Sequence, residues 1–165
     1  LGPIANEVDP HALHLFSNSL VGLAPQGWMR RWDNHGNVSA GPWPEAEEYL
    51  RLAAAVFISE EDLLDGEMLG KYRQWSRLLV MTQGQDGCTI FFNDEARHFP
   101  AFHGPVVDTT GAGDVFATAF LLRLFQTDGN PAEAAQYANK AASLSIGVAG
   151  LRAKMETLST HLAAE

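Results

Sequence analysis

The sequence is poor in cysteine and in positive charge, and both shortages narrow what the protein can do. Cys88 is the only cysteine in 165 residues, which excludes an intrachain disulfide and a cysteine-based metal cluster. Only 11 Lys and Arg residues stand against 20 Asp and Glu residues, giving a formal net charge of −9. This charge argues against nucleic acid or an anionic membrane as a partner. No apolar run approaches the roughly 20 residues that span a membrane, so we expect a soluble, cytoplasmic protein.

The length and composition are those of one globular domain, with 46% hydrophobic and 19% charged residues. Residues 1–5 are typical of a buried strand and lack the basic and apolar segments of a signal peptide. A sequence that begins inside a strand predicts that further residues precede Leu1. We therefore interpret the chain as part of a longer protein.

Short apolar segments alternate with helical ones, which predicts an α/β fold with a mostly parallel sheet covered by helices. We expect strands at residues 1–5, 20–23, 55–58, 78–82, 88–92 and 97–99, with a hairpin loop before the last. We expect helices from residue 9 and over 45–53, 66–75, 115–125, 130–146 and 153–163, and a loop over 34–44. The helix over 115–125 is apolar almost all round, which predicts burial, and Met155, Leu158 and Leu162 mark a packing face on the last helix.

A glycine pair before an apolar helix is the most informative feature of the sequence. Gly111 and Gly113 flank Ala112 and leave the backbone N–H groups at the helix start open to an anion, which the helix dipole also favours. Asp114 would repel a resting phosphate, but it would accept a proton from a hydroxyl that attacks the phosphate, while the amides stabilise the transferred group. A simpler alternative is that Thr110 or Asp114 only caps a helix after a glycine turn.

Residues 108–116, D-T-T-G-A-G-D-V-F, closely resemble the C-terminal signature D-T-T-G-A-G-D-x-F of the PfkB/ribokinase family of carbohydrate and nucleoside kinases. The resemblance implies that Asp114 is the catalytic base and that residues 111–113 form the anion hole for the transferred phosphoryl group. It also implies a three-layer α/β/α fold with a mostly parallel central sheet.

The same resemblance implies a monovalent-cation site. Asp108 and Thr110 correspond to family positions beside that site, and Ser145 and Gly150 fall where the family closes its cation loop. The resemblance therefore makes potassium a candidate cofactor, although residues 146–149 depart from the family's usual T-R-x-G at this place.

Two segments resemble the family's nucleotide-binding elements. Residues 80–87 are similar to the strand-end pattern V-T-x-G-x-x-G, which implies that Thr82, Gly84 and Gly87 line the nucleotide phosphates and ribose. Taken alone, this segment is typical of a simple hairpin turn. Asn139 corresponds to the Asn of the family's A-N-x-A-A helix, which implies a place beside adenine; taken alone, that helix is a small-residue packing helix.

An acidic segment follows the strand at 55–58, where the family has N-x-x-E. Ser59 and Asp62 occupy these two positions. Both offer oxygen ligands, and Mg²⁺ accepts water-mediated carboxylate contacts, so the resemblance implies that Ser59 contacts the phosphates and Asp62 the magnesium. Glu60 and Glu61 equally suit the first turn of a helix, where acids complement the dipole.

The resemblance covers residues 1 to about 151 and corresponds to the C-terminal, nucleotide-binding part of a ribokinase-like kinase. It implies an enzyme that transfers the γ-phosphate of ATP, with Mg²⁺, to a primary hydroxyl of a sugar, polyol or nucleoside. The family's N-terminal strands and lid are absent, which predicts an unpaired sheet edge and allows a homodimer. Two alternatives stay open: a nucleotide-binding regulatory or interaction module without phosphoryl transfer, and a plain α/β domain.

Two other features have structural interpretations. Residues 28–32 are rich in Trp and Arg, and we expect them to form a packed loop. We expect Cys88 to be an inert thiol in the core.

Overall fold

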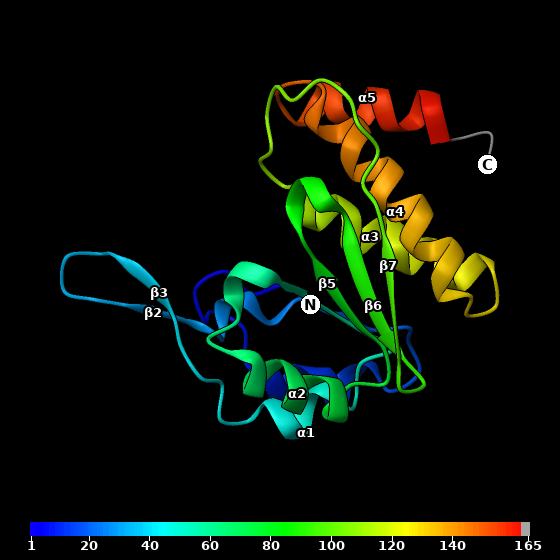
Figure 1. Ribbon diagram of the computed structural model, residues 1–165. Helices are drawn as coiled ribbons and strands as arrows, with labels where there is room; N and C mark the ends of the chain where they lie inside the picture. Colours follow the sequence, from blue (N-terminus) through cyan, green and yellow to red (C-terminus); the bar gives the residue numbers. More distant parts are fainter. Residues whose placement is uncertain (163–165) are drawn as a thin grey trace. The chain divides into compact units, whose positions relative to one another are not determined.

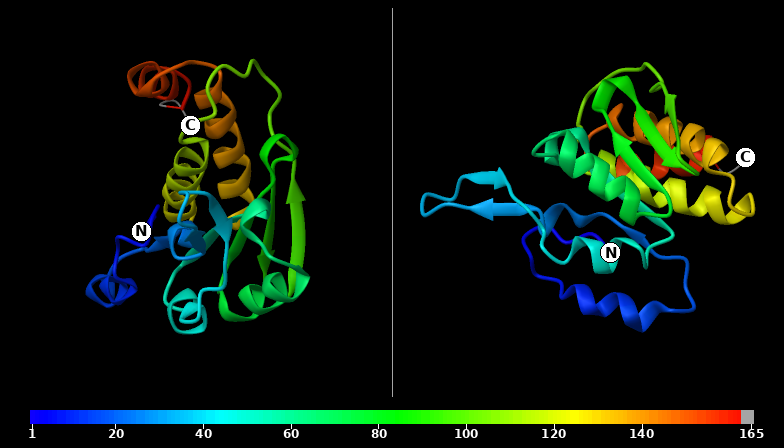
Figure 2. Two further views of the ribbon diagram at one scale, coloured as in Figure 1. Left: turned by 90° about the vertical axis from the view of Figure 1, so that its left-hand side faces the viewer. Right: turned by 60° about the horizontal axis from the view of Figure 1, so that its bottom comes forward.

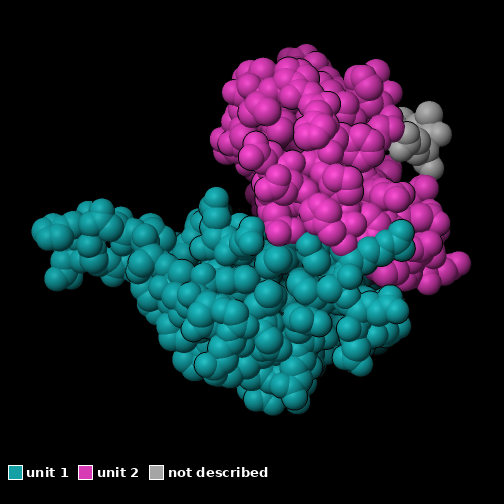
Figure 3. Space-filling view, in the orientation of Figure 1, with its two compact units in different colours: residues 1–82, 89–97 teal, residues 83–88, 98–165 magenta. Residues whose placement is uncertain are grey.

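The computed structural model describes residues 1–162, which divide into two compact units (Figure 3). Unit 1 contains residues 1–82 and 89–97, and unit 2 contains residues 83–88 and the chain from residue 98 onward. No helix within residues 1–162 is long and apolar enough to cross a membrane.

A five-stranded sheet has the order β1-β4-β5-β6-β7. Its strands are β1 (Gly22–Leu23), β4 (Ala55–Ser59), β5 (Leu79–Thr82), β6 (Cys88–Phe92) and β7 (Glu95–Phe99). Strands β1, β4 and β5 run parallel, and the β4–β5 register pairs Val56 with Leu79 and Ser59 with Thr82. The first four residues of β4 are apolar and buried, as expected for a parallel strand covered on both faces.

Short helices and one apolar core complete unit 1. The helices are η1 (Pro10–Phe16), η2 (Pro25–Gly27), α1 (Ala46–Leu50), η3 (Glu60–Asp62) and α2 (Gly66–Trp75). The Asp9 side chain caps η1 at the position that the Asp-Pro pair predicts, although η1 is a 3-10 helix. The core joins β4 and β5 to the helices through fully buried side chains such as Leu23, Tyr49, Leu50 and Leu79.

An antiparallel two-stranded ribbon in unit 1 corrects two expectations. Strands β2 (Arg30–Trp32) and β3 (Val38–Ala40) pair and extend away from the rest of the unit (Figure 1). The loop expected over 34–44 therefore contains a strand, and only the first residues of the segment 28–32 form a packed loop. The ribbon residues are mostly exposed, so no burial pattern marks them in the sequence.

Three helices dominate unit 2, together with the turn η4 (Gly84–Asp86). Helix α3 (Ala112–Gln126) lies beside α4 (Pro131–Ile146), and α4 contacts α5 (Leu151–Leu162), as both views in Figure 2 show. Alanines that are completely or almost completely buried on α4 allow this close packing. They are Ala134, Ala135, Ala138 and Ala141.

Three further expectations are wrong in detail. Residues 1–5 form no strand, although Leu1 makes two backbone hydrogen bonds beside β1, because Pro3 has no N–H to extend a ladder. Helix α3 is not buried all round: Phe125 is 72% exposed. On α5, Met155 is 59% exposed whereas Lys154 is buried, and residue 163 of the expected helix lies outside the described residues.

Candidate active site

The glycine motif forms the start of α3, as the sequence predicts. Gly111 is the N-cap residue with φ 74°, a left-handed conformation that glycine adopts without strain. The N–H of Ala112 donates to the Thr109 carbonyl at 3.1 Å, and that of Val115 donates to the Gly111 carbonyl at 3.0 Å. Among residues 1–162, the N–H groups of Gly111, Gly113 and Asp114 have no hydrogen-bond partner. Three free donors therefore lie at the positive end of the helix.

Open space surrounds the second glycine of the motif. A Cβ built on Gly113 meets no atom within 4 Å, so packing within the described chain does not require glycine here. Glycine inside a helix costs about 1 kcal/mol relative to alanine. A ligand that approaches the helix start closely would explain why this cost is retained.

Asp114 lies exposed in the first turn of α3, and its side chain turns back over the glycine turn. Its Oδ2 atom is 3.9 Å from the position that a Cβ on Gly111 would occupy. The carboxylate is therefore adjacent to the free N–H donors. The N-cap residue is Gly111 and no side chain of the described residues caps α3, so the alternative that Thr110 or Asp114 caps this helix is wrong. A carboxylate in a first helical turn is also stabilised by the helix dipole.

Asp108 organises the turn before the motif. Its carboxylate accepts from the Thr110 N–H at 3.0 Å and from the Gly150 N–H at 3.4 Å. These bonds, that of the Thr110 side chain and the nearby Lys154 ammonium hold the pKa of Asp108 well below its usual range. The N–H groups of Val107 and Asp108 both donate to the Ile146 carbonyl, at 2.7 and 3.1 Å. The turn is thus tied to the C-terminal end of α4.

Lys154 is a residue of this site that the sequence reasoning missed. It is only 5% exposed, and its Nζ atom lies 2.9 Å from the Asp108 carbonyl, 2.6 Å from the Thr110 carbonyl and 3.2 Å from Asp108 Oδ2. One sequence signal was available: Lys154 precedes Leu158 by four residues, so it falls on the same face of the expected helix as this predicted packing residue.

The other two residues predicted for the cation site have internal roles. Ser145 is completely buried and donates its hydroxyl to the Ala142 carbonyl at 2.7 Å. Gly150 has φ 80° at the start of α5 and donates its N–H to Asp108. Asp108, Thr110 and Gly150 are brought together, whereas the Ser145 hydroxyl is directed to its own helix.

Asn139 and Gly87 support the segment that follows β7. Asn139 is 4% exposed, and its Nδ2 donates to the carbonyls of Phe99 at 3.0 Å and Pro100 at 3.2 Å, with Cys88 Sγ at 3.6 Å. Gly87 is buried with φ 96°, and a Cβ there would lie 2.7 Å from the carbonyl carbon of Pro100. Both residues hold residues 99–101 in place, and their predicted contacts with a nucleotide stay predictions.

Burial of Cys88 leads to a testable chemical property. Desolvation raises the pKa of its thiol from 9.0 to about 12, although the hydrogen bond from Asn139 acts in the opposite direction. Because the thiolate is the reactive form, native Cys88 is expected to react with a thiol reagent roughly a thousandfold more slowly than the denatured chain at mildly alkaline pH. The reaction is followed by the absorbance of the group that the thiol reagent releases. Equal reaction rates of Cys88 in buffer and in denaturant would contradict its burial.

The raised pKa of Cys88 also makes the stability of the fold depend on pH. The folded chain holds the Cys88 proton more tightly than the unfolded chain between pH 9.0 and about 12. The contribution of the thiol to stability is therefore complete below pH 9.0 and is lost as the pH rises through this interval.

Ser59, predicted to contact the phosphates, and Asp62, predicted to contact magnesium, lie in unit 1 at the carboxyl end of β4 and in η3. The Asp62 carboxylate accepts from the Ser59 N–H at 3.2 Å and from Gln26 Nε2 at 3.2 Å, and the Ser59 hydroxyl accepts from the Glu61 N–H at 3.3 Å. This reciprocal capping starts η3, so the acidic segment has the helix-start role that the sequence left open. Thr82 donates its hydroxyl to the Ile58 carbonyl at 3.2 Å.

Gly84 is the remaining residue predicted to line the nucleotide. Gly84 is exposed with φ 56°, and a Cβ there would meet no atom within 4 Å. No group of three or more His, Cys, Asp or Glu side chains that would hold a metal ion occurs in the part of the chain that the structure describes. A Mg²⁺ ion would thus depend largely on phosphate oxygens and water, with fewer than three such side chains from the described residues.

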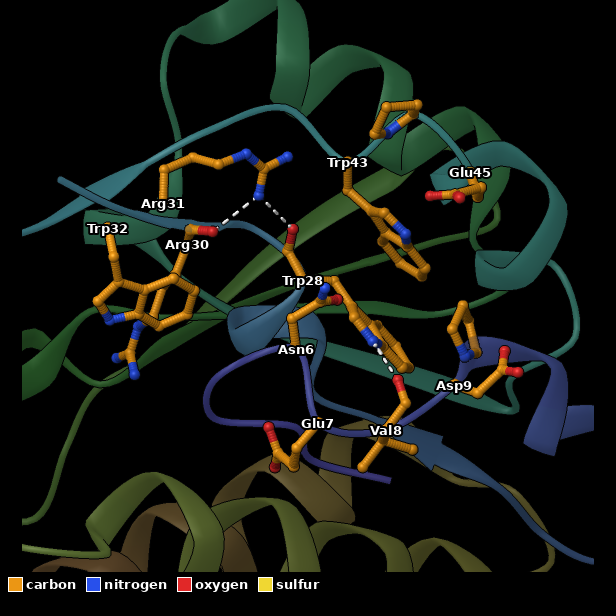
Figure 4. A pocket seen from close by; sticks show the side chains of 12 residues that line it. Asn6, Glu7, Val8, Asp9, Trp28, Arg30, Arg31, Trp32, Trp43 and Glu45 are labelled. Atoms are coloured by element: carbon orange, nitrogen blue, oxygen red, sulfur yellow. Dashed lines mark hydrogen bonds between the residues drawn. The ribbon is translucent and has the colours of Figure 1, made fainter. Parts of the chain in front are cut away.

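A separate cavity of about 780 Å³ lies in unit 1, lined by residues 6–10, Trp28, strand β2 and residues 43–45 (Figure 4). Trp28 donates its indole N–H to the Val8 carbonyl at 2.7 Å and stacks on Trp43 with ring centroids 4.6 Å apart. Arg31 donates to the Trp28 carbonyl at 2.9 Å. The aromatic and basic residues of the segment 28–32 therefore line this cavity, and none of the predicted site residues does.

Comparison with known proteins places the chain in a family. Residues 39–158 match the family model described as pfkB family carbohydrate kinase. A ribokinase from Bacillus subtilis is 40% identical over 80 residues, which are 48% of this chain and 27% of the relative. The chain covers about a third or less of the length of the curated relatives that it matches.

Solved structures share the fold. The ribokinase from Thermotoga maritima aligns over 88% of this chain and 50% of its own, with a TM-score of 0.65 and 23% identity. A pyrophosphate-dependent kinase of the ribokinase family, complexed with a pyrophosphate analogue and myo-inositol, aligns over 92% of this chain and 59% of its own, with a TM-score of 0.75 and 16% identity. The fold is therefore ribokinase-like, and the chain belongs to the pfkB family of carbohydrate kinases.

Proposed function

We propose that the protein transfers the γ-phosphoryl group of ATP to a primary hydroxyl of a small sugar, polyol or nucleoside. One observation carries this proposal: the free N–H groups of Gly111, Gly113 and Asp114 lie next to the Asp114 carboxylate at the start of α3. Amide donors stabilise the charge that accumulates on a transferred phosphoryl group, and a carboxylate beside them is placed to accept the proton of the attacking hydroxyl.

In the proposed reaction, Asp114 accepts the proton of the acceptor hydroxyl as its oxygen attacks the γ-phosphorus. The bond from the γ-phosphorus to the bridging oxygen breaks, and ADP leaves. The N–H groups of residues 111 and 113 donate to the equatorial oxygens of the transferred group, where negative charge accumulates. Asp114 and the donors belong to the same helical turn, so their relative positions are set by backbone geometry.

Magnesium would neutralise the phosphates when it is bound together with ATP. The described residues suit an ion that keeps most of its water, with Asp62 as the proposed water-mediated ligand and Ser59 as a proposed phosphate contact. Thr82, Gly84, Gly87 and Asn139 remain proposed neighbours of the nucleotide, on the strength of the family resemblance.

Gly113→Ala tests the anion hole. Outside the neighbouring helix backbone, the added methyl meets no atom within 4 Å. We expect it to obstruct the approach of an anion to the free amides. We expect ATP and pyrophosphate to bind at least about tenfold more weakly by calorimetry, equivalent to about 1.4 kcal/mol. Stability is expected to be unchanged or to rise by up to about 1 kcal/mol, since alanine favours the helix.

Gly70→Ala is the matched control, because Gly70 is also a helical glycine with no atom within 4 Å of a built Cβ. It should raise stability in the same way and leave binding unchanged. Turnover is measured with the whole protein by ADP release over a panel of sugars, polyols and nucleosides. Binding without turnover on any acceptor would favour a regulatory module, and absence of binding to both donors would refute the proposed function.

A further inference from the structure

The ammonium group of Lys154 is enclosed by oxygen atoms in unit 2. Its side chain is 7% exposed, and its three contacts are the carbonyls of Asp108 and Thr110 and the Asp108 carboxylate. An ammonium group has three N–H donors, so each contact uses one of them. The cation is therefore fully solvated by the protein, and its charge is balanced by one carboxylate.

A buried lysine in this arrangement needs a reason. Removing an ammonium group from water is costly, and a lysine is seldom buried unless it is paired and hydrogen-bonded. Two main-chain carbonyls two residues apart converge on the Nζ atom, at 2.9 and 2.6 Å. Backbone carbonyls that converge on one point replace the hydration shell of a monovalent cation.

The residues present do not fit an added potassium ion. Lys154 occupies the point toward which the oxygens of Asp108 and Thr110 converge, and the Ser145 hydroxyl is directed to Ala142. A second cation at this point would be repelled by the ammonium group at a distance of a few ångströms. The cation expected from the sequence resemblance is thus incompatible with the contacts of Lys154.

We infer that the Lys154 ammonium acts as a covalently tethered monovalent cation, which fixes the turn before α3 and makes the site independent of potassium. Lys154 holds both carbonyls that flank Thr109, and the Thr109 carbonyl accepts the N–H of Ala112. Through this turn, Lys154 positions the free amides of α3 without touching substrate. The role of Lys154 in positioning the amides rests on the proposed function. Its role as a substitute for a potassium ion does not.

The test compares thermal unfolding of the chain in potassium chloride and in choline chloride at one ionic strength. The wild-type melting temperature is expected to be the same in both salts. Lys154→Ser removes the ammonium and leaves space beside Asp108, so its melting temperature should fall by about 10 °C in choline chloride. Potassium chloride should recover a substantial part of that loss, because K⁺ can enter the vacated position.

Arg152→Ser is the control, since Arg152 is a cation on the same helix whose side chain is 92% exposed. It should lose little stability and respond equally to the two salts. A wild-type protein that melts at a higher temperature in potassium than in choline would overturn the inference, whether or not the variant folds. A folded Lys154→Ser variant that is indifferent to potassium would overturn it as well. No nucleotide is present, so failure of the proposed kinase function would not affect these results.

Discussion

Asp114→Asn in the whole protein is expected to reduce the rate of phosphoryl transfer by about 10²- to 10⁴-fold, the usual contribution of a general base. Asparagine has nearly the same shape but cannot accept the acceptor's proton. Binding of ATP should stay within a few-fold of wild type or become tighter, because a negative charge near the phosphates is removed. Coupled detection of ADP gives the rate, and calorimetry gives the affinity.

Glu133→Gln is the matched control for this variant. Glu133 is an exposed acid in the first turn of α4, where it has the same favourable relation to a helix dipole. Each substitution should cost about 0.3–1 kcal/mol of stability for that reason, but only Asp114→Asn should slow the reaction. Near-parental turnover of Asp114→Asn would show that Asp114 is a helix-start acid and not the base.

Gly87→Ala is expected to destabilise unit 2 by about 2–6 kcal/mol. The backbone of Gly87, with ψ −126°, lies outside the left-handed helical region, and such a conformation costs a non-glycine residue about 1–3 kcal/mol. Overpacking adds about 1–3 kcal/mol. The φ of Gly87 is 96°, and the added Cβ would lie 2.5 Å from the Ala101 nitrogen and would clash with the Phe99 carbonyl oxygen. Backbone atoms cannot move aside as a flexible side chain can. Denaturant unfolding measures the loss.

Gly84→Ala separates strain from collision. Gly84 also has a positive φ, 56°, but a Cβ there would meet no atom within 4 Å. Its substitution should therefore cost only the conformational part, about 1–2 kcal/mol. If the two variants lost the same stability, the close approach of residues 99–101 to Gly87 would not exist in solution.

The regular elements could be predicted where pattern and burial agree. The helix expected over 66–75 is α2, the strand expected over 55–58 is β4 with one more residue, and the helix opened by Asn130 and Pro131 is α4. At these positions a capping residue or a continuous apolar run specifies the element locally. The hairpin loop before β7 is confirmed by positive φ at Asn93 and Asp94.

The errors arise where tertiary contacts overrule local pattern. Strands β2 and β3 are short and mostly exposed, and they exist because they pair with each other. Helix α3 is apolar around its circumference, yet Leu122 is 48% exposed, because packing against α4 covers only part of its surface. The pattern of apolar residues in a helix does not determine how much of its surface other elements of the fold cover.

In the candidate site, too, local features could be predicted and tertiary contacts could not. The motif at 111–114 predicted its own place at a helix start because glycines and a following apolar run are local signals. Lys154 was missed because a lysine is read as solvent-exposed unless its partners are known, and two of those partners are carbonyls, which no sequence displays. The internal role of Asn139 was hidden for the same reason, since it also bonds main-chain oxygens.

The double hydrogen bond to the Ile146 carbonyl has a consequence for recognition. Because Val107 and Asp108 are both fastened to the last residue of a 16-residue helix, the segment that leads into the glycine turn is ordered by folding itself. An anion that docks at α3 meets donors that are already aimed, and little backbone entropy is lost in the encounter. Such preorganisation raises the affinity for an anion, because little of the binding free energy is lost in ordering the chain.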